Sequence, residues 1–158
     1  MNSVSSVVRV MQQGDVERIQ EIYLLAHVDE YAGEVTDFPP QGVSDNPALL
    51  ELFHLSDIFV HDDGEAIKGF VGSRNNRVIW LYVDPEFRGQ KIGQQLIDFM
   101  LSQLTGTVGI SVIKSNRIAL GLYQRRGFKV IGDFVFDYQG VPVDVYSMQR
   151  VSALQQAS

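Results

Sequence analysis

The sequence predicts a single α+β domain in which helices flank a central mixed, mostly antiparallel sheet. Two patterns lead to this fold class. Short apolar or alternating segments are joined by tight-turn sequences, which is typical of β-hairpins. Longer segments place apolar residues three and four positions apart, which is typical of amphipathic helices. The 158 residues suffice for one hydrophobic core but not for two domains of ordinary size.

The N-terminal third predicts one strand and two helices. Val7–Met11 is predicted as a strand, and Asp15 as the N-cap of a helix that runs to about His27. Segment 29–47 is rich in proline and glycine and is predicted to be irregular. A proline suits the first helical turn, so a short helix is predicted from position 47 to about position 55.

From residue 58 onward, turn signals separate strands from helices. Trp80, Phe70 and Phe134 are expected in the hydrophobic core. The order of elements, with hairpins beside crossover helices, predicts a mixed sheet of about six to seven strands and about four helices. The predicted segments are strands 58–61, 66–73 and 78–83, a helix from Gln90 to about Leu104, strand 108–113, helix 118–126 closed by Gly127, and strands 129–138 and 143–149.

Composition excludes several classes of protein. The absence of cysteine excludes disulfide frameworks, thiolate metal sites and cysteine nucleophiles. A pI near 4.9 argues against general nucleic-acid binding. No apolar run approaches the roughly 18 residues of a membrane span, and the first residues lack a signal-peptide pattern. We therefore expect a cytoplasmic protein without a nucleic-acid or membrane partner.

The net charge of −6 hides an uneven distribution. Residues 1–67 contain 13 acidic and two basic residues, whereas residues 68–158 contain 11 basic and six acidic residues. Within the acidic part, segment 29–51 has no lysine or arginine. Such a region would attract a cation.

The sharpest local pattern is a strand, turn and helix start over residues 81–93. A helix N-terminus offers unpaired backbone N–H groups and positive partial charge, which suit a pyrophosphate. Gly89 and Gly93 allow a ligand to approach the backbone closely, and Arg88 and Lys91 add positive charge. The pattern by itself fits a tightly packed turn with two solvated cations equally well.

A second pattern, Asn116, Ala119, Leu122-Tyr123 and Gly127-Phe128, lies within residues 115–128. This segment resembles the GNAT superfamily of N-acetyltransferases. The Arg88–Gly93 turn resembles that family's acyl-CoA pyrophosphate loop, Gln/Arg-x-x-Gly-x-Gly/Ala. The similarity covers roughly residues 66–150. It implies a GNAT-like fold, acetyl-CoA as cosubstrate without a metal, and direct transfer of an acetyl group to a primary amine.

The resemblance also implies roles for individual residues. Tyr123 would be the general acid for the departing thiolate, because a tyrosine pKa of about 10 keeps the hydroxyl protonated at pH 7. The alternative is a core tyrosine. Asn116 would bind the pantetheine arm, cap its helix, or do both. The implied acyl-CoA-binding residues are Leu81, Tyr82, Val83, Arg88, Gly89, Gln90, Lys91, Ile92, Gly93 and Asn116.

The sequence departs from the family pattern at two places. Lys91 stands where glycine is usual, which is tolerable if its backbone angles are helical. Ser111 stands where amino-terminal protein acetylases of this family often have a glutamate, so no general base is evident. The candidate bases elsewhere in the chain are Glu30, Glu34, Asp37, His54 and Asp57. The candidate phosphate contacts, at or beside the predicted helix 118–126, are Arg117, Arg125 and Arg126.

These observations predict an acceptor-side region at about residues 15–57 and an acyl-CoA-binding core at about residues 66–150. The acceptor would be cationic, such as a small amine, a polyamine or a peptide amine. A non-catalytic acyl-CoA-binding or protein-interaction module on the same fold is the alternative, as is an enzyme for O-acylation or longer acyl chains. A monomer or a homodimer is expected.

Overall fold

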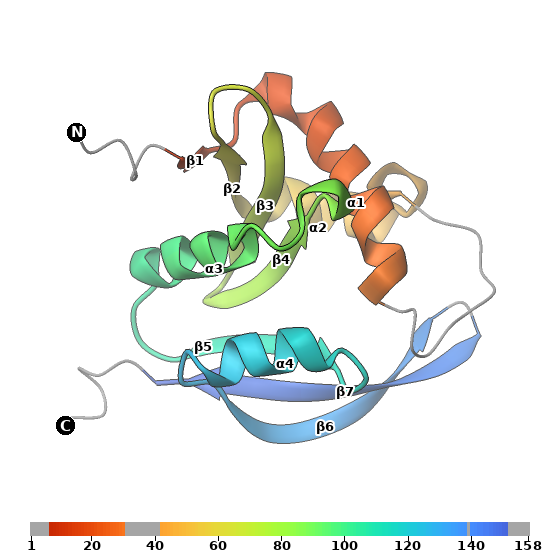
Figure 1. The fold of residues 1–158 in the computed structure, drawn as a ribbon. Helices are drawn as coiled ribbons and strands as arrows, with labels where there is room; N and C mark the ends of the chain where they lie inside the picture. Colours follow the sequence, from red (N-terminus) through yellow and green to blue (C-terminus); the bar gives the residue numbers. More distant parts are fainter. Residues whose placement is uncertain (1–6, 31–41, 139, 152–158) are drawn as a thin grey trace.

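The computed structural model describes residues 7–30, 42–138 and 140–151, in which seven strands form one sheet in the order β1-β2-β3-β4-β5-β7-β6 (Figure 1). The strands are β1 (Val8–Val10), β2 (Asp57–Asp62), β3 (Ile67–Arg74), β4 (Arg77–Val83), β5 (Val108–Ile113), β6 (Lys129–Tyr138) and β7 (Val141–Arg150). The helices are α1 (Val16–Glu30), α2 (Pro47–Leu55), α3 (Ile92–Gln103) and α4 (Arg117–Gln124), with short 3-10 turns η2 (Gln13–Asp15), η3 (Val43–Asp45) and η4 (Pro85–Phe87). The predicted fold class is confirmed.

One strand pair differs from all the others in the sheet. β4 and β5 are parallel, and every other neighbouring pair is antiparallel. The parallel pairing comprises only Arg77 opposite Gly109 and Val78 opposite Ile110. Beyond these two positions the strands diverge, and α3 makes the crossover that a parallel pair requires (Figure 1). The sheet therefore opens in its middle.

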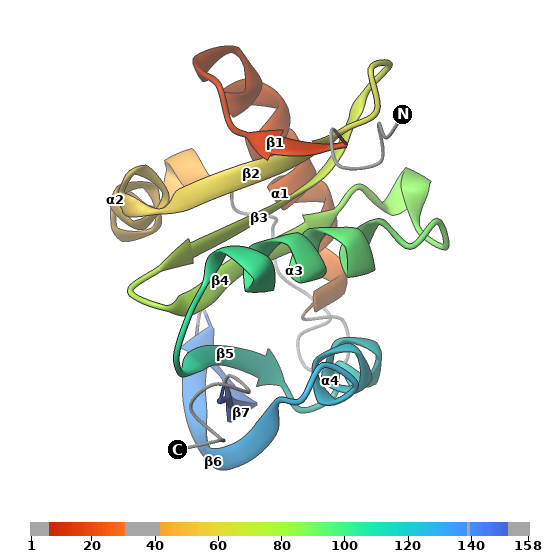
Figure 2. The same ribbon diagram turned by 90° about the vertical axis from the view of Figure 1, so that its left-hand side faces the viewer.

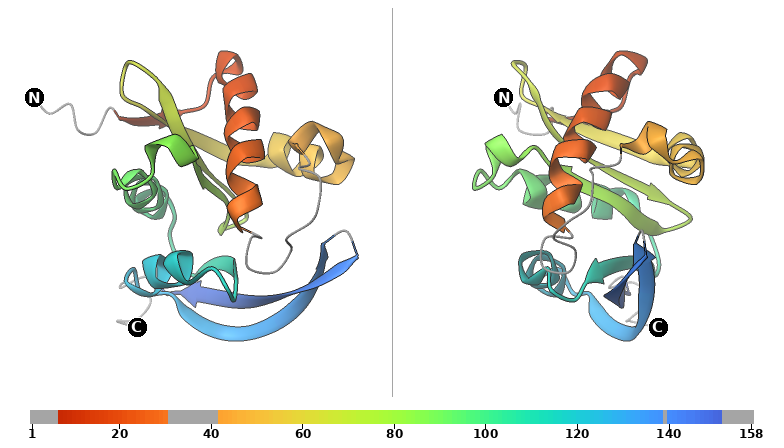
Figure 3. Two further views of the ribbon diagram at one scale, coloured as in Figure 1. Left: turned by 45° about the vertical axis from the view of Figure 1, so that its right-hand side comes forward. Right: turned by 90° about the vertical axis from the view of Figure 1, so that its right-hand side faces the viewer.

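Two hydrophobic clusters hold the helices on opposite faces of the sheet (Figures 2 and 3). On the face of α1 and α2, Trp80 is 1% exposed, and its ring meets those of Tyr23 and Phe53 edge-on, with centroids 5.8 Å apart in each pair. On the face of α3, Leu96 and Met100 pack on β3, β4 and β5. Helices cover both faces of the sheet, which explains why β3 and β4 consist largely of apolar residues and glycine.

Local sequence signals set most element boundaries. Asn46 caps α2 by accepting hydrogen bonds from the N–H groups of Ala48 and Leu49. Asn75 and Asn76 both have positive φ, as a two-residue hairpin turn requires. Gly127 ends α4 with φ of 91°. The hairpins and the short helix 47–55 are therefore where the sequence predicted them.

Two predictions about single residues are wrong. Asp15 does not cap α1, because its carboxylate turns back to accept from the Gln12 N–H at 2.8 Å and pairs with Arg9. That ion pair lowers the pKa of Asp15 despite partial burial and joins β1 to the start of α1. Phe134 lies on β6, the edge strand, and its side chain is 46% exposed instead of buried in the core.

Among the described residues, no helix combines the length and the apolar character that crossing a bilayer requires.

His27 is fully buried on α1. Its ring stacks on that of Tyr23 with centroids 4.5 Å apart, and Nδ1 lies 2.9 Å from the Tyr23 carbonyl oxygen. Burial lowers the pKa of His27 below its usual value because the charged imidazolium is poorly solvated there. The folded protein therefore holds this side chain neutral.

We expect the free energy of unfolding to fall as the pH drops below the ordinary histidine pKa of about 6.5, because the unfolded chain then takes up a proton that folded His27 does not. Replacing His27 with Phe keeps a ring against Tyr23 and should flatten this dependence. Urea titrations between about pH 5 and pH 7.5 would measure it. His54→Gln is the matched control, since His54 is exposed on α2; equal slopes for His27→Phe and the wild type would contradict the prediction.

Candidate active site

The divergence of β4 from β5 creates a pocket of about 630 Å³, bounded by the C-terminal part of β4, the start of α3, and α4. Ten of the 11 predicted site residues line it, although they come from segments more than 20 positions apart in sequence. Gln90 is exposed and is the one that does not. The predicted lining residues are Leu81, Tyr82, Val83, Arg88, Gly89, Lys91, Ile92, Gly93, Asn116 and Tyr123.

The turn after β4 is anchored to α1 through Asp84. Asp84 is buried, donates its N–H to the Lys68 carbonyl, and caps η4 by accepting from the Glu86 N–H. Its other carboxylate oxygen lies 2.6 Å from Nη2 of Arg18. Burial would raise the pKa of Asp84, but the Glu86 hydrogen bond and the Arg18 charge outweigh it and lower that pKa. These contacts hold Asp84 in place, so they fix the position at which the turn begins.

The start of α3 presents backbone donors to the pocket. The helix makes its first i to i−4 hydrogen bond from the Gln95 N–H to the Lys91 carbonyl, so the preceding amides have no partner inside the helix. A Cβ added at Gly93 would meet only Val83 Cγ2, at 3.8 Å, so the space in front of this glycine is open. An anionic group can approach the backbone there.

The charge of the pocket is positive. Arg88, Lys91 and Arg125 line it, and none of its described lining residues is acidic. Arg126, by contrast, follows α4 and pairs with Asp98 of α3 at 2.7 Å. Of the three predicted candidate arginines, Arg125 is therefore the one that the fold brings to the pocket.

The backbone of Lys91 differs from the expectation. Its φ of 64° and ψ of 21° are left-handed, as in glycine, and are not those of a right-handed helix. This explains why α3 begins at Ile92 instead of Gln90. A side chain at such angles costs about 1 kcal/mol or more. The glycine usual at this position would avoid that cost.

α4 brings Asn116 and Tyr123 to the same pocket. Asn116 Oδ1 caps α4 by accepting from the Ala119 N–H, and its amide nitrogen has no hydrogen bond in the described part of the chain. Tyr123 is 7% exposed and meets the Phe128 ring at 6.0 Å, so it also belongs to the core. The cap and the core position are therefore confirmed, and both residues also lie at the pocket, as their predicted roles require.

The two predicted candidate bases whose side chains the structure describes do not line this pocket. His54 is exposed on α2 and does not line it, and Asp57 lines a different pocket. Glu34, Asp37 and the side chain of Glu30 lie outside the described residues. Ser111 does line the pocket, and its hydroxyl accepts from Arg77 Nη2 at 2.9 Å.

Several lining residues were missed. Ile118, Ala119 and Leu122 share the pocket face of α4 with Tyr123, and their spacing of three and four residues could have predicted this. Gln94 continues the start of α3, and Phe87 lies in η4. Ala26 comes from α1, and no local sequence signal connects it with this site.

We expect Lys91→Gly to raise the free energy of unfolding by about 1 kcal/mol, because glycine adopts left-handed angles without strain. Urea unfolding followed by circular dichroism would measure the change. Gln90→Gly is the matched control, since Gln90 is exposed and has no positive φ. If both variants lose stability, the left-handed position carries no strain.

Comparison with known proteins shows similarity to acetyltransferases. Residues 54–130 match the model of the acetyltransferase (GNAT) domain. The chain is 32% identical over 91 residues to the peptidyl-lysine N-acetyltransferase YjaB of Salmonella typhimurium, an alignment that covers 58% of this chain and 61% of that protein. The chain thus spans about three fifths of the length of this curated relative.

Solved structures share the fold. A GCN5-related N-acetyltransferase of Rhodopseudomonas palustris superposes with a TM-score of 0.76 at 13% identity, covering 92% of this chain and 94% of the other. The yncA protein of Salmonella typhimurium, solved with its cofactor acetyl-CoA, gives 0.69 at 18% identity, covering 91% and 92%. These structures show that the chain has the fold of GNAT acetyltransferases, and residues 54–130, just under half of the chain, are similar to the GNAT domain model.

Proposed function

We propose that this protein is an N-acetyltransferase that moves an acetyl group from acetyl-CoA directly to a primary amine. The proposal rests on one observation: residues of both sequence blocks line the same pocket at the opening between β4 and β5. We assign acyl-CoA binding to about residues 66–150 and the acceptor side to about residues 15–57.

The described residues fit an acyl-CoA molecule. The open space before Gly93, the unpaired amides of α3 and the cations Arg88, Lys91 and Arg125 suit its phosphate groups. The end of β4 has no ladder partner on its β5 side and can offer backbone groups to an extended amide arm. Asn116 has an amide nitrogen available beside that arm.

Acetyl-CoA supplies the activated thioester. The chain positions this thioester and donates a proton to the departing thiolate. The acceptor nitrogen forms a bond to the acetyl carbon as the carbon–sulfur bond breaks. Tyr123, which lines the pocket, donates its hydroxyl proton to the departing thiolate. The amine must arrive as the free base, and we assign removal of its proton to water, because the described lining residues include no carboxylate.

A decisive test separates binding from catalysis. We expect calorimetry to show binding of acetyl-CoA or CoA at micromolar concentrations, and Tyr123→Phe to lower kcat by about 100-fold or more without changing that affinity. Tyr146→Phe is the matched control, because Tyr146 lies on β7 outside the pocket. Absence of CoA binding would contradict the proposal.

The pocket also allows a second candidate function. Because the described lining includes no acidic base, a non-catalytic acyl-CoA-binding or protein-interaction module would have the same geometry. Such a module would bind CoA, but the wild type and the Tyr123→Phe variant would both lack turnover.

The acceptor is proposed to be cationic, and a lysine side chain is favoured by the name of the YjaB relative. We expect lysine-containing peptides and polyamines to exceed neutral or anionic acceptors in kcat/KM, because the region around α2 is acidic in sequence. An acceptor screen that detects free CoA thiol would measure this. A peptide with its lysine replaced by norleucine is the control, and preference for neutral acceptors would overturn the assignment.

A further inference from the structure

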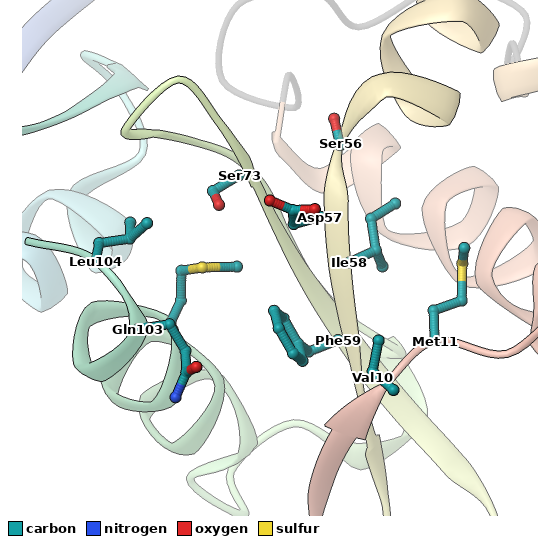
Figure 4. A pocket seen from close by; sticks show the side chains of 10 residues that line it. Val10, Met11, Ser56, Asp57, Ile58, Phe59, Ser73, Gln103 and Leu104 are labelled. Atoms are coloured by element: carbon teal, nitrogen blue, oxygen red, sulfur yellow. The ribbon is translucent and has the colours of Figure 1, made fainter.

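A second pocket, of about 350 Å³, lies beside the C-terminal ends of α2 and α3 (Figure 4). It shares no lining residue with the pocket of Tyr123. Its walls come from β1, β2, β3 and the C-terminal end of α3, so they are built from parts of the rigid core. The site is therefore separate from the acetyl-transfer site and needs its own explanation.

Asp57 supplies the one charged side chain of this pocket within the described residues. In that part of the chain its carboxylate takes part in neither an ion pair nor a hydrogen bond. Neighbouring acids behave differently: Asp15 and Asp62 pair with Arg9, and Asp63 pairs with Lys68. Asp57 is exposed, so its carboxylate is open to solvent and to a ligand in the pocket.

Ser73 provides a second polar group from the neighbouring strand. It is directly opposite Asp57 in the β2–β3 register, and Figure 4 shows both side chains beside the same space. Ser73 is only 3% exposed, yet within the described residues its hydroxyl has no hydrogen-bond partner. Its hydroxyl oxygen is not among the fully buried side-chain atoms that lack a partner, so it is open to the pocket and can accept a hydrogen bond there.

The ends of two helices add to the negative potential. The pocket is lined by Ser56, which follows α2, and by Gln103 and Leu104 at the end of α3. The last turn of a helix leaves backbone carbonyl groups without helical partners and carries a partial negative charge. Asp57 therefore lies where two such charges converge, which favours a cation.

The remaining wall is apolar. Ile58 and Met100 are buried, and Phe59 packs edge-on against Phe99 with centroids 4.9 Å apart. A bare metal ion would gain nothing from these side chains, whereas a hydrocarbon or aromatic group would be removed from water by them. The volume accommodates a small organic molecule.

We propose that this pocket binds a small organic ammonium ion with an apolar body. The ammonium group donates hydrogen bonds to the Asp57 carboxylate and the Ser73 hydroxyl oxygen, and the apolar body packs on Phe59 and Met100. The proposal is independent of the acetyl-transfer function, since the two pockets share no residue.

The probe is 3-phenylpropylamine, compared with the neutral 3-phenylpropan-1-ol, in titrations of the full chain followed by amide NMR with and without saturating CoA. We expect saturable shifts at residues 57–59, 73 and 100–104, and at least about tenfold weaker binding of the alcohol. Asp57→Asn should weaken amine binding by about tenfold or more, and Ser73→Ala by about threefold. Glu51→Gln is the matched control, because Glu51 is an exposed acid on α2 outside the pocket.

Three results would overturn the proposal: no saturable shift at amine concentrations up to about 10 mM, equal binding of amine and alcohol, or equal effects of Asp57→Asn and Glu51→Gln. Shifts confined to Leu81–Val83 and Tyr123 would also overturn it, because the amine would then occupy the acetyl-transfer pocket alone. The backbone amide spectrum of each variant reports its folding in the same experiment.

Discussion

The short parallel junction between β4 and β5 is the constraint on which the site depends. Two cross-strand pairs join these strands, and Asn76 secures the junction by donating its side-chain amide to the carbonyl groups of Thr105 and Thr107. Gly109 lies beside it, and a Cβ added there would lie 2.6 Å from Nη1 of Arg77, so the flexible end of that side chain would have to move. Past this junction each strand follows its own antiparallel partner, so the sheet separates and leaves room for an extended ligand.

Helix ends give the two pockets opposite electrostatic character. α3 directs its N-terminal amides toward the Tyr123 pocket and places its C-terminal residues in the Asp57 pocket. The side chains reinforce this polarity, with Arg88, Lys91 and Arg125 at one end and Asp57 at the other. One 12-residue helix thereby separates a site suited to anions from a site suited to cations.

The uneven charge of the chain gains a structural explanation from this arrangement. Most basic residues lie after position 67, and three of them line the pocket proposed for acyl-CoA. Several acidic residues before position 68 form structural ion pairs, such as that of Asp15 with Arg9. Lys91 places a cation beside that pocket at a left-handed backbone position, which glycine would fill without strain.

The sequence by itself determined the element order, the hairpin turns, the helix caps and most of the pocket, because caps, glycines and apolar periodicity act between residues close together in the chain. Tertiary structure decided the left-handed backbone of Lys91, the inward turn of Asp15 and the exposure of Phe134. It also decided that Ala26 reaches the pocket of Tyr123 and that Ser73 lies opposite Asp57 on the neighbouring strand. These features depend on which segments the sheet brings together, and contacts between distant segments leave no local pattern in the sequence.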